Sequence, residues 1–305
     1  MSISNTLLIT ALLSVCSFTT LAQKSEGKRI LKLKLCSFSA QGGAIIESNV
    51  NETPTDFKQL APQSVVLNVA STRHYLTNTG YTSFGSGTFL GNNLFTVSAS
   101  FKFGNKQKTE YRKGMLLRVG INYFSETNLS ATFYTKETTV YDTLIAANAT
   151  SAVYLDSVSR KYYNMNYASK QLRLDAALLL RTDPYERWSL YTGIGVNGGV
   201  SVNAQTTINY HEYEELETRY QSGANYTSPL TNKEKIEKHT NQNNIVTSAY
   251  IPLGADFRIG NTHHFWTRAH LFYELRPSFN VTYIPELRTI ANFSFQHGIG
   301  FRYSL

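Results

Sequence analysis

The chain has 305 residues, and few of them are charged or cysteine. Charged residues make up 16% of the total, well below the roughly 25% of an ordinary soluble domain. The seven prolines and 19 glycines are too few for a collagen or a low-complexity chain. Beyond the N-terminus, no apolar run approaches the roughly 18 residues that a membrane-spanning helix requires. These absences exclude fibrous, disordered and helical membrane proteins.

The N-terminus has the pattern of a targeting segment. Leu7 to Val15 form a short apolar run, and small and polar residues lead to Ala22. This pattern predicts a secretory signal peptide over residues 1–22, cleaved after Ala22, and a single domain over 23–305. A lipid-modified Cys16 is the alternative. Removal of the signal leaves Cys36 as the one cysteine, so an internal disulfide is excluded.

Strict two-residue alternation is the strongest signal in the rest of the chain. In the segment LFTVSASFKF, residues 94–103, Phe95, Val97 and Phe101 fall on one face, and the other face is mostly polar. Residues 114–124 and 171–181 repeat this pattern. Such alternation predicts strands with one apolar and one polar face.

Eight such strands can be counted, and the connections between them alternate between long and short. This is the pattern of an antiparallel up-and-down β-barrel that spans a membrane, with short periplasmic turns and long extracellular loops. Closure leaves no unpaired strand edge in lipid, where nothing else satisfies the backbone. The predicted strands cover about 30–40, 94–103, 114–124, 170–181, 188–203, 246–259, 265–276 and 290–305.

The C-terminal segment FSFQHGIGFRYSL carries the most specific motif. Ile299, Phe301, Tyr303 and Leu305 alternate to the last residue. This segment resembles the C-terminal assembly signal of small eight-stranded outer-membrane β-barrel proteins of Gram-negative bacteria, the OmpA-like barrel class, although members usually end in Phe. The resemblance implies an outer-membrane location, contact with outer-membrane lipids and lipopolysaccharide, and recognition by the barrel-assembly machinery. His297 falls on the lipid-facing phase, so either water reaches it or a bulge near Gly298 shifts the phase.

The inward phase carries more positive than negative charge. An isolated buried charge is costly, so the inward charges are expected to pair. We expect the charge pairs to involve Arg118, Arg173, Asp175, Asp256, Glu274 and Arg276. The cations predicted for the periplasmic half form a vestibule that favours anions; they are Lys32, Lys34, Lys102, Arg181, Arg258, Arg268 and Arg302.

Three long connections, 41–92, 125–169 and 204–245, are predicted to face the exterior and to bind an extracellular ligand. In the first, Thr55 is expected to cap a helical turn that buries Phe57 and Leu60 at the barrel mouth. The second is expected to continue as a hairpin. The third has two oppositely charged arms, which either pair or remain two solvated faces; the charges are Glu212, Glu214, Glu215 and Glu217 against Lys233, Lys235 and Lys238.

The function that fits these features is a monomeric outer-membrane barrel whose external loops form a non-catalytic interaction or structural platform. A narrow channel or small-solute conduit with a cationic periplasmic vestibule is the main alternative. An enzyme with His270, Glu274 and Ser278 at its centre, and a secretion or assembly accessory, come after it. No cofactor, metal site or nucleic-acid module is expected, and the net charge of +8 suits anionic lipopolysaccharide.

Overall fold

A computed structural model describes residues 32–47, 53–69, 92–104, 115–145, 152–182, 186–219 and 227–305. The predicted signal peptide and its cleavage site after Ala22 lie outside these ranges. Among the described residues, no helix is long and apolar enough to cross a membrane.

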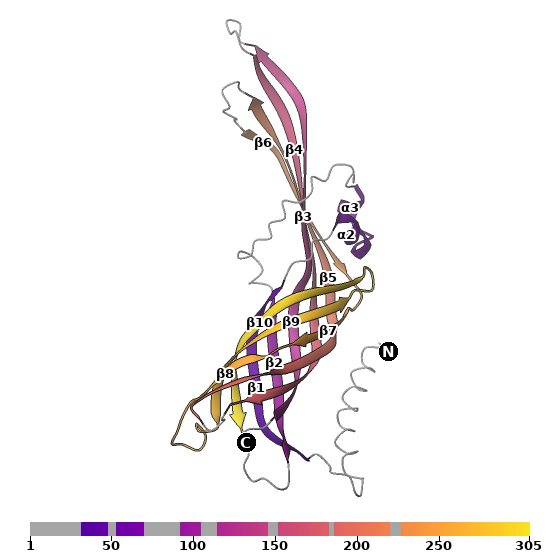
Figure 1. The fold of residues 1–305 in the computed structure, drawn as a ribbon. Helices are drawn as coiled ribbons and strands as arrows, with labels where there is room; N and C mark the ends of the chain where they lie inside the picture. The colour runs from indigo at the N-terminus through magenta and orange to yellow at the C-terminus, as the bar shows by residue number, and fades with distance from the viewer. Residues whose placement is uncertain are drawn as a thin grey trace.

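The strands form one antiparallel sheet that closes on itself (Figure 1). Each strand pairs with the next around the ring, and β10 pairs with both β9 and β1. β7 and β8 both pair with β5 and β9, so together they fill one of eight positions. The strands are β1 (Lys32–Glu47), β2 (Asn93–Gly104), β3 (Met115–Ile145), β4 (Ala152–Arg181), β5 (Trp188–Arg219), β6 (Thr227–Thr240), β7 (Ile245–Tyr250), β8 (Leu253–Arg258), β9 (Ala269–Tyr283) and β10 (Thr289–Ser304).

The two faces of the barrel wall differ as the alternation predicted. In β2, Ser98 and Ser100 are buried in the lumen, whereas the side chains of Phe95 and Val97 are about half exposed on the outside. A one-residue slip would exchange these faces, so the barrel register is strongly specified. Of the two alternatives for His297, the bulge near Gly298 is wrong, because β10 pairs with both neighbours without a shift and His297 faces outward beside Tyr273.

Pro252 separates β7 from β8 without changing the register. Tyr250 pairs with Gly195 and Leu253 pairs with Thr192, so the residues on both sides continue one pairing series along β5. Proline has no backbone N–H, and one ladder hydrogen bond is therefore missing at this point. The predicted strand 246–259 is thus one strand with a local interruption.

Three barrel strands continue far beyond the barrel at one end. β3 pairs with β4 up to Ile145, β4 pairs with β5 up to Arg219, and β6 adds a fourth strand along β5 (Figure 1). We call this four-stranded part the projecting sheet. The second connection, 125–169, therefore continues as a hairpin of β3 and β4, as expected, and much of the third, 204–245, is also strand. Near the barrel, one face of this sheet carries buried apolar residues such as Tyr163 and Met165, and the other face is polar.

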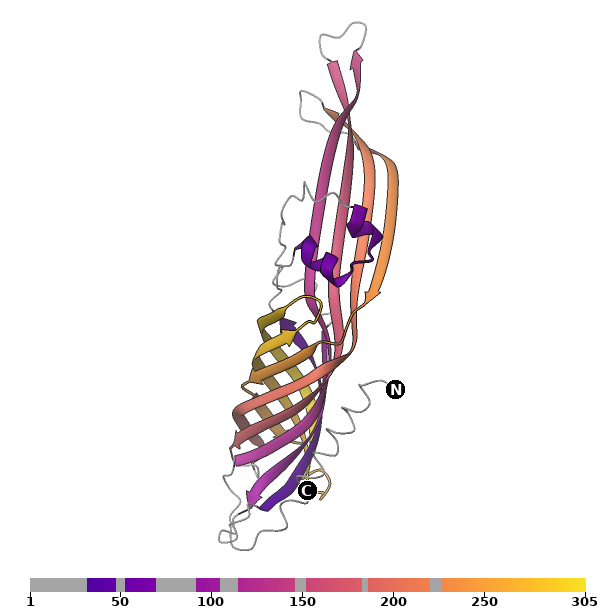
Figure 2. The ribbon, with the colours of Figure 1, turned by 90° about the vertical axis from the view of Figure 1, so that its right-hand side faces the viewer.

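Two short helices, α2 (Pro54–Leu60) and α3 (Val65–Val69), lie against one face of the projecting sheet (Figure 2). The residue that caps α2 is Thr53 and not Thr55, because Thr53 and Asp56 form a reciprocal capping box. Phe57 and Leu60 are fully buried, as expected. They pack in an apolar cluster with residues of β3, β4 and β5 and with Ile284 and Ile290 beside the β9–β10 turn. The helices therefore cover the barrel end from which the sheet projects.

Candidate functional site: a filled lumen below a projecting sheet

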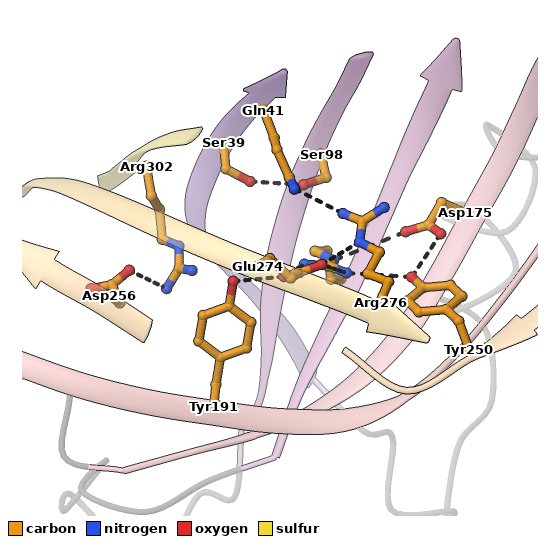
Figure 3. Close-up of polar contacts among 11 residues, drawn as sticks. Ser39, Gln41, Ser98, Asp175, Tyr191, Tyr250, Asp256, Glu274, Arg276 and Arg302 are labelled. Atoms are coloured by element: carbon orange, nitrogen blue, oxygen red, sulfur yellow. Dashed lines mark hydrogen bonds and ion pairs between the residues drawn. The ribbon is translucent and has the colours of Figure 1, made fainter. Parts of the chain in front are cut away.

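Glu274 on β9 is the centre of a buried charge network in the lumen (Figure 3). Its carboxylate accepts hydrogen bonds from Arg118 on β3, at 2.6 and 3.0 Å, and from the hydroxyl of Tyr191 on β5, at 2.6 Å. Arg276, two residues along β9, also donates to it. Because two guanidinium groups face a single carboxylate, the network needs a second acid.

Asp175 on β4 is that second acid. It accepts a hydrogen bond from the hydroxyl of Tyr250 at 2.7 Å, and its other oxygen lies 3.9 Å from Nε of Arg118. Arg276 also donates to the Gln41 side chain on β1, at 2.9 Å. The network therefore crosses the lumen between β1, β3, β4, β5, β7 and β9 (Figure 3). Charge-assisted hydrogen bonds of this kind are the strong ones.

Inward glycines make room for the rings that join this network. Gly254 is the cross-strand partner of Tyr191, and a Cβ added to it would overlap the tyrosine ring. Gly195 has the same relation to Tyr250. Each ring therefore lies flat over a neighbouring backbone and sends its hydroxyl to a carboxylate, which explains the mixture of large and glycine residues on the inward phase.

The cations predicted for the periplasmic end surround an acid. Arg181 and Arg302 both contact the Asp256 carboxylate, at 2.6 and 2.9 Å, and His270 Nδ1 lies 2.7 Å from it. Asp256 lies at the level of Arg181, because its cross-strand neighbours are Ser189 on β5 and Phe272 on β9.

The other predicted cations lie nearer the barrel end. Lys34 is exposed and directly opposite the half-buried Lys102, and Arg268 is also half-buried. Arg258 donates to Asn261 at 3.3 Å. The side chain of Lys32 lies outside the described residues. This end of the lumen therefore carries several cations near the carboxylate of Asp256.

A third group lies toward the projecting sheet. Arg173 on β4 contacts Glu126 on β3 at 2.6 Å and donates to Gln171 at 2.8 Å, and all three side chains are buried. Arg173 also lies over the Phe124 ring, 3.8 Å from its centroid. Sequence reasoning missed Glu126 because the third strand was expected to end at residue 124. Glu126 falls on the same phase as the inward residues before it, so extending the two-residue alternation past residue 124 would have identified it.

The residues considered for catalysis bind other partners. His270 contacts Asp256, Glu274 belongs to the arginine network, and the Ser278 hydroxyl donates to the Arg276 carbonyl. They do not form a nucleophile and base pair. Within the described ranges, no three His, Cys, Asp or Glu side chains could hold a metal ion together. At the C-terminus, Ile299 and Leu305 are exposed on the outer surface; their role in barrel assembly stays a prediction.

The charges of the projecting sheet pair across several strands. The two arms of the third connection pair as β5 and β6, and Glu212 on β5 lies 3.5 Å from Lys233 on β6. Arg160 on β4 binds Glu215 and Glu217, which sequence reasoning did not anticipate. Because β4 lies between β3 and β5, the acidic stretch of β5 contacts β4 as well as β6. These partly exposed pairs are individually weak.

Glu237 on β6 fastens the helices to the sheet. Its carboxylate accepts hydrogen bonds from the Ser64 hydroxyl at 2.5 Å and from the Val66 backbone N–H at 3.4 Å, and Lys235 lies at 2.9 Å. Burial acts to raise the pKa of Glu237, but the hydrogen bonds from Ser64 and Lys235 and the Lys235 charge outweigh it and lower the pKa. The ionised carboxylate therefore stabilises the helix position.

No protein-family model and no curated protein matches this chain. Among solved structures, it is similar to Ail, the attachment invasion locus protein of Yersinia pestis, solved in complex with the heparin analogue sucrose octasulfate. The two chains are 12% identical, the match covers 88% of this chain and 97% of Ail, and the TM-score is 0.21. The strand pairing itself establishes an all-β closed antiparallel barrel with an apolar exterior, the architecture of small outer-membrane barrels.

Proposed function

We propose that this chain is an outer-membrane barrel that anchors the projecting sheet as a non-catalytic extracellular interaction platform. The observation that carries this proposal is the combination of a filled lumen with strands that continue beyond the barrel. Three groups of buried charge, centred on Asp256, Glu274 and Glu126, lie in the lumen.

A filled lumen supports an anchor because eight strands enclose a bore just wide enough for side chains. The network around Glu274 joins six strands, so it holds the barrel shape against the load of a long sheet at one end. A narrow conduit for small anions is the alternative. It requires water to pass Arg118 and Arg276, whose side chains are almost completely buried.

The orientation can be tested by cysteine labelling in a Cys36→Ser background. Thr138 lies on the projecting sheet and Asn261 lies in the turn after β8, and both are exposed. In intact cells, a membrane-impermeant maleimide should label a cysteine that replaces Thr138 and not one that replaces Asn261. After cell lysis both should react. Labelling of the Asn261 position alone, or of both positions before lysis, contradicts the proposed orientation.

The sealed state can be tested separately by planar-bilayer recording. Wild-type protein should give no steady conductance, because the side chains of Arg118, Glu274 and Arg276 are almost completely buried across the lumen. A stable single-channel conductance in the wild type would favour the conduit over the anchor.

A further inference from the structure

Above the barrel, the outward faces of β3, β4 and β5 change from apolar to uncharged polar. In the barrel these faces carry exposed apolar side chains such as Ile121 and Leu174. Lys170 on β4 and its cross-strand partner Asn203 on β5 mark the end of the apolar band. Beyond them lies a group that we call the collar patch: Ser130, Thr132, Asn164, Asn166, Gln205, Thr207 and Asn209.

The strand register assembles the collar patch into two complete rows. Asn166 pairs with Ser130 on one side and Thr207 on the other. Asn164 pairs in the same way with Thr132 and Asn209, and the Thr132 hydroxyl lies 2.9 Å from Oδ1 of Asn164. Direct cross-strand neighbours on one face have Cβ atoms about 4.5–5.5 Å apart. The side chains therefore form one continuous, partly exposed surface on the face opposite the helices.

Charged residues surround the collar patch but do not enter it. Lys170 lies below it, and Lys238 on β6 is the cross-strand partner of Thr207. Lys136 and Arg160 form a cross-strand pair above it. A surface that only needed to be soluble would carry charged residues. The need for solubility therefore does not explain why the collar patch has none. A surface that keeps hydroxyl and amide groups and excludes charge fits a neutral polar ligand.

Aromatic rings border the same surface. Tyr134 and Tyr162 form the next cross-strand pair above Thr132 and Asn164, with ring centroids 5.1 Å apart. Tyr213 stacks on Tyr162 at 5.5 Å. Tyrosine offers an apolar ring together with a polar hydroxyl. This combination suits sugars, which present both C–H faces and hydroxyl groups.

We propose that the collar patch binds the saccharide portion of a glycolipid in the surrounding leaflet. The inference rests on the proposed outer-membrane location. The patch continues the lipid-facing surface, so acyl chains that pack on the band below bring their sugar headgroup to its height. Amide and hydroxyl groups each supply both donors and acceptors, which match sugar hydroxyls and require no charge.

The test compares full-length lipopolysaccharide with lipid A, which lacks the polysaccharide, in titrations of the detergent-solubilised protein by native mass spectrometry. The patch variant combines Thr132→Val, Asn164→Leu and Thr207→Val. The control combines Thr139→Val, Ser157→Ala and Ser159→Ala on the opposite face of the same sheet. The patch variant should lose at least tenfold in affinity for lipopolysaccharide and keep its affinity for lipid A, and the control should keep both.

Three results would overturn the inference: unchanged lipopolysaccharide binding by the patch variant, equal loss of both ligands, or no preference for lipopolysaccharide in the wild type. A second measurement does not depend on the triple variant. Added polysaccharide should slow maleimide labelling of a cysteine at Asn166 and not at Thr139, and equal protection contradicts the proposal. The cysteine labelling of Thr138 and Asn261 tests the orientation of the barrel separately. A barrel in the wrong orientation is therefore distinguishable from a collar patch that does not bind sugar.

Discussion

Replacement of Glu274 by glutamine should strongly destabilise the barrel. The carboxylate faces Arg118, Arg276 and the Tyr191 hydroxyl, and its side chain is completely buried. The neutral amide would leave two buried guanidinium groups with Asp175 as the nearest acid. Removing one partner of a buried ion pair costs about 3–5 kcal/mol, so we expect a loss of this size in the free energy of unfolding.

The assay is urea unfolding in detergent micelles, followed by the fluorescence of Trp188 and Trp266 and by the migration of unheated protein on gels. Glu234→Gln is the matched control, because that glutamate is largely exposed beside His211 and should change stability by less than about 0.5 kcal/mol. Adding Arg118→Met to the Glu274 variant removes the excess cation. The double variant should therefore be at least about 1 kcal/mol more stable than the sum of the single effects predicts. Additive losses, or a Glu274 effect equal to the control, would refute the reasoning.

Three other predictions follow from local packing and titration. Gly254→Ala should displace the Tyr191 ring and lower the free energy of unfolding by about 1–3 kcal/mol in the same urea assay. An unchanged unfolding midpoint would contradict the close contact between Gly254 and the ring. Phe57→Ala should free the helices without unfolding the barrel, because it removes about 3 kcal/mol of local burial. Trypsin cleavage at the exposed Lys58 should then accelerate more than tenfold. Unfolding of the barrel in this variant would contradict the prediction. Since the folded-state pKa of Glu237 is lowered, its stabilisation is complete above the ordinary glutamate pKa of about 4.3 and is lost as pH falls through the folded value. The hydrogen-exchange protection of residues 54–69, measured relative to the intrinsic exchange rate at each pH, should fall on acidification in wild type and stay unchanged in Glu237→Gln.

The barrel was predictable from sequence because lipid imposes a simple rule on every spanning strand. Each outward residue must be apolar, so Val97 and Ile121 alternate with Ser98 and Asn122 through the barrel section. The inward charges could also be named as a set, since they share one phase of the alternation. Their partners could not, because Arg118 and Glu274 are separated by 156 positions in the chain. Only closure of the ring brings them together.

The projecting sheet was predicted only in part. The hairpin over 125–169 was expected from its sequence, whereas the pairing of the two arms of 204–245 was left open, because exposed charge pairs are too weak to decide it. The capping residue of α2 was misassigned by two positions although the local sequence marks it: Pro54 suits the first helical position, and Asp56 completes the capping box with Thr53.

By itself, the sequence determined that the chain forms a barrel and which side chains face its lumen, because the contrast between hydrocarbon and an enclosed polar interior acts on each residue separately. The tertiary structure alone decided which charges pair, that the lumen is filled, and that hydroxyl and amide groups of three strands meet above the apolar band. These depend on distances between residues far apart in the chain, which are set only when the strands close and pair.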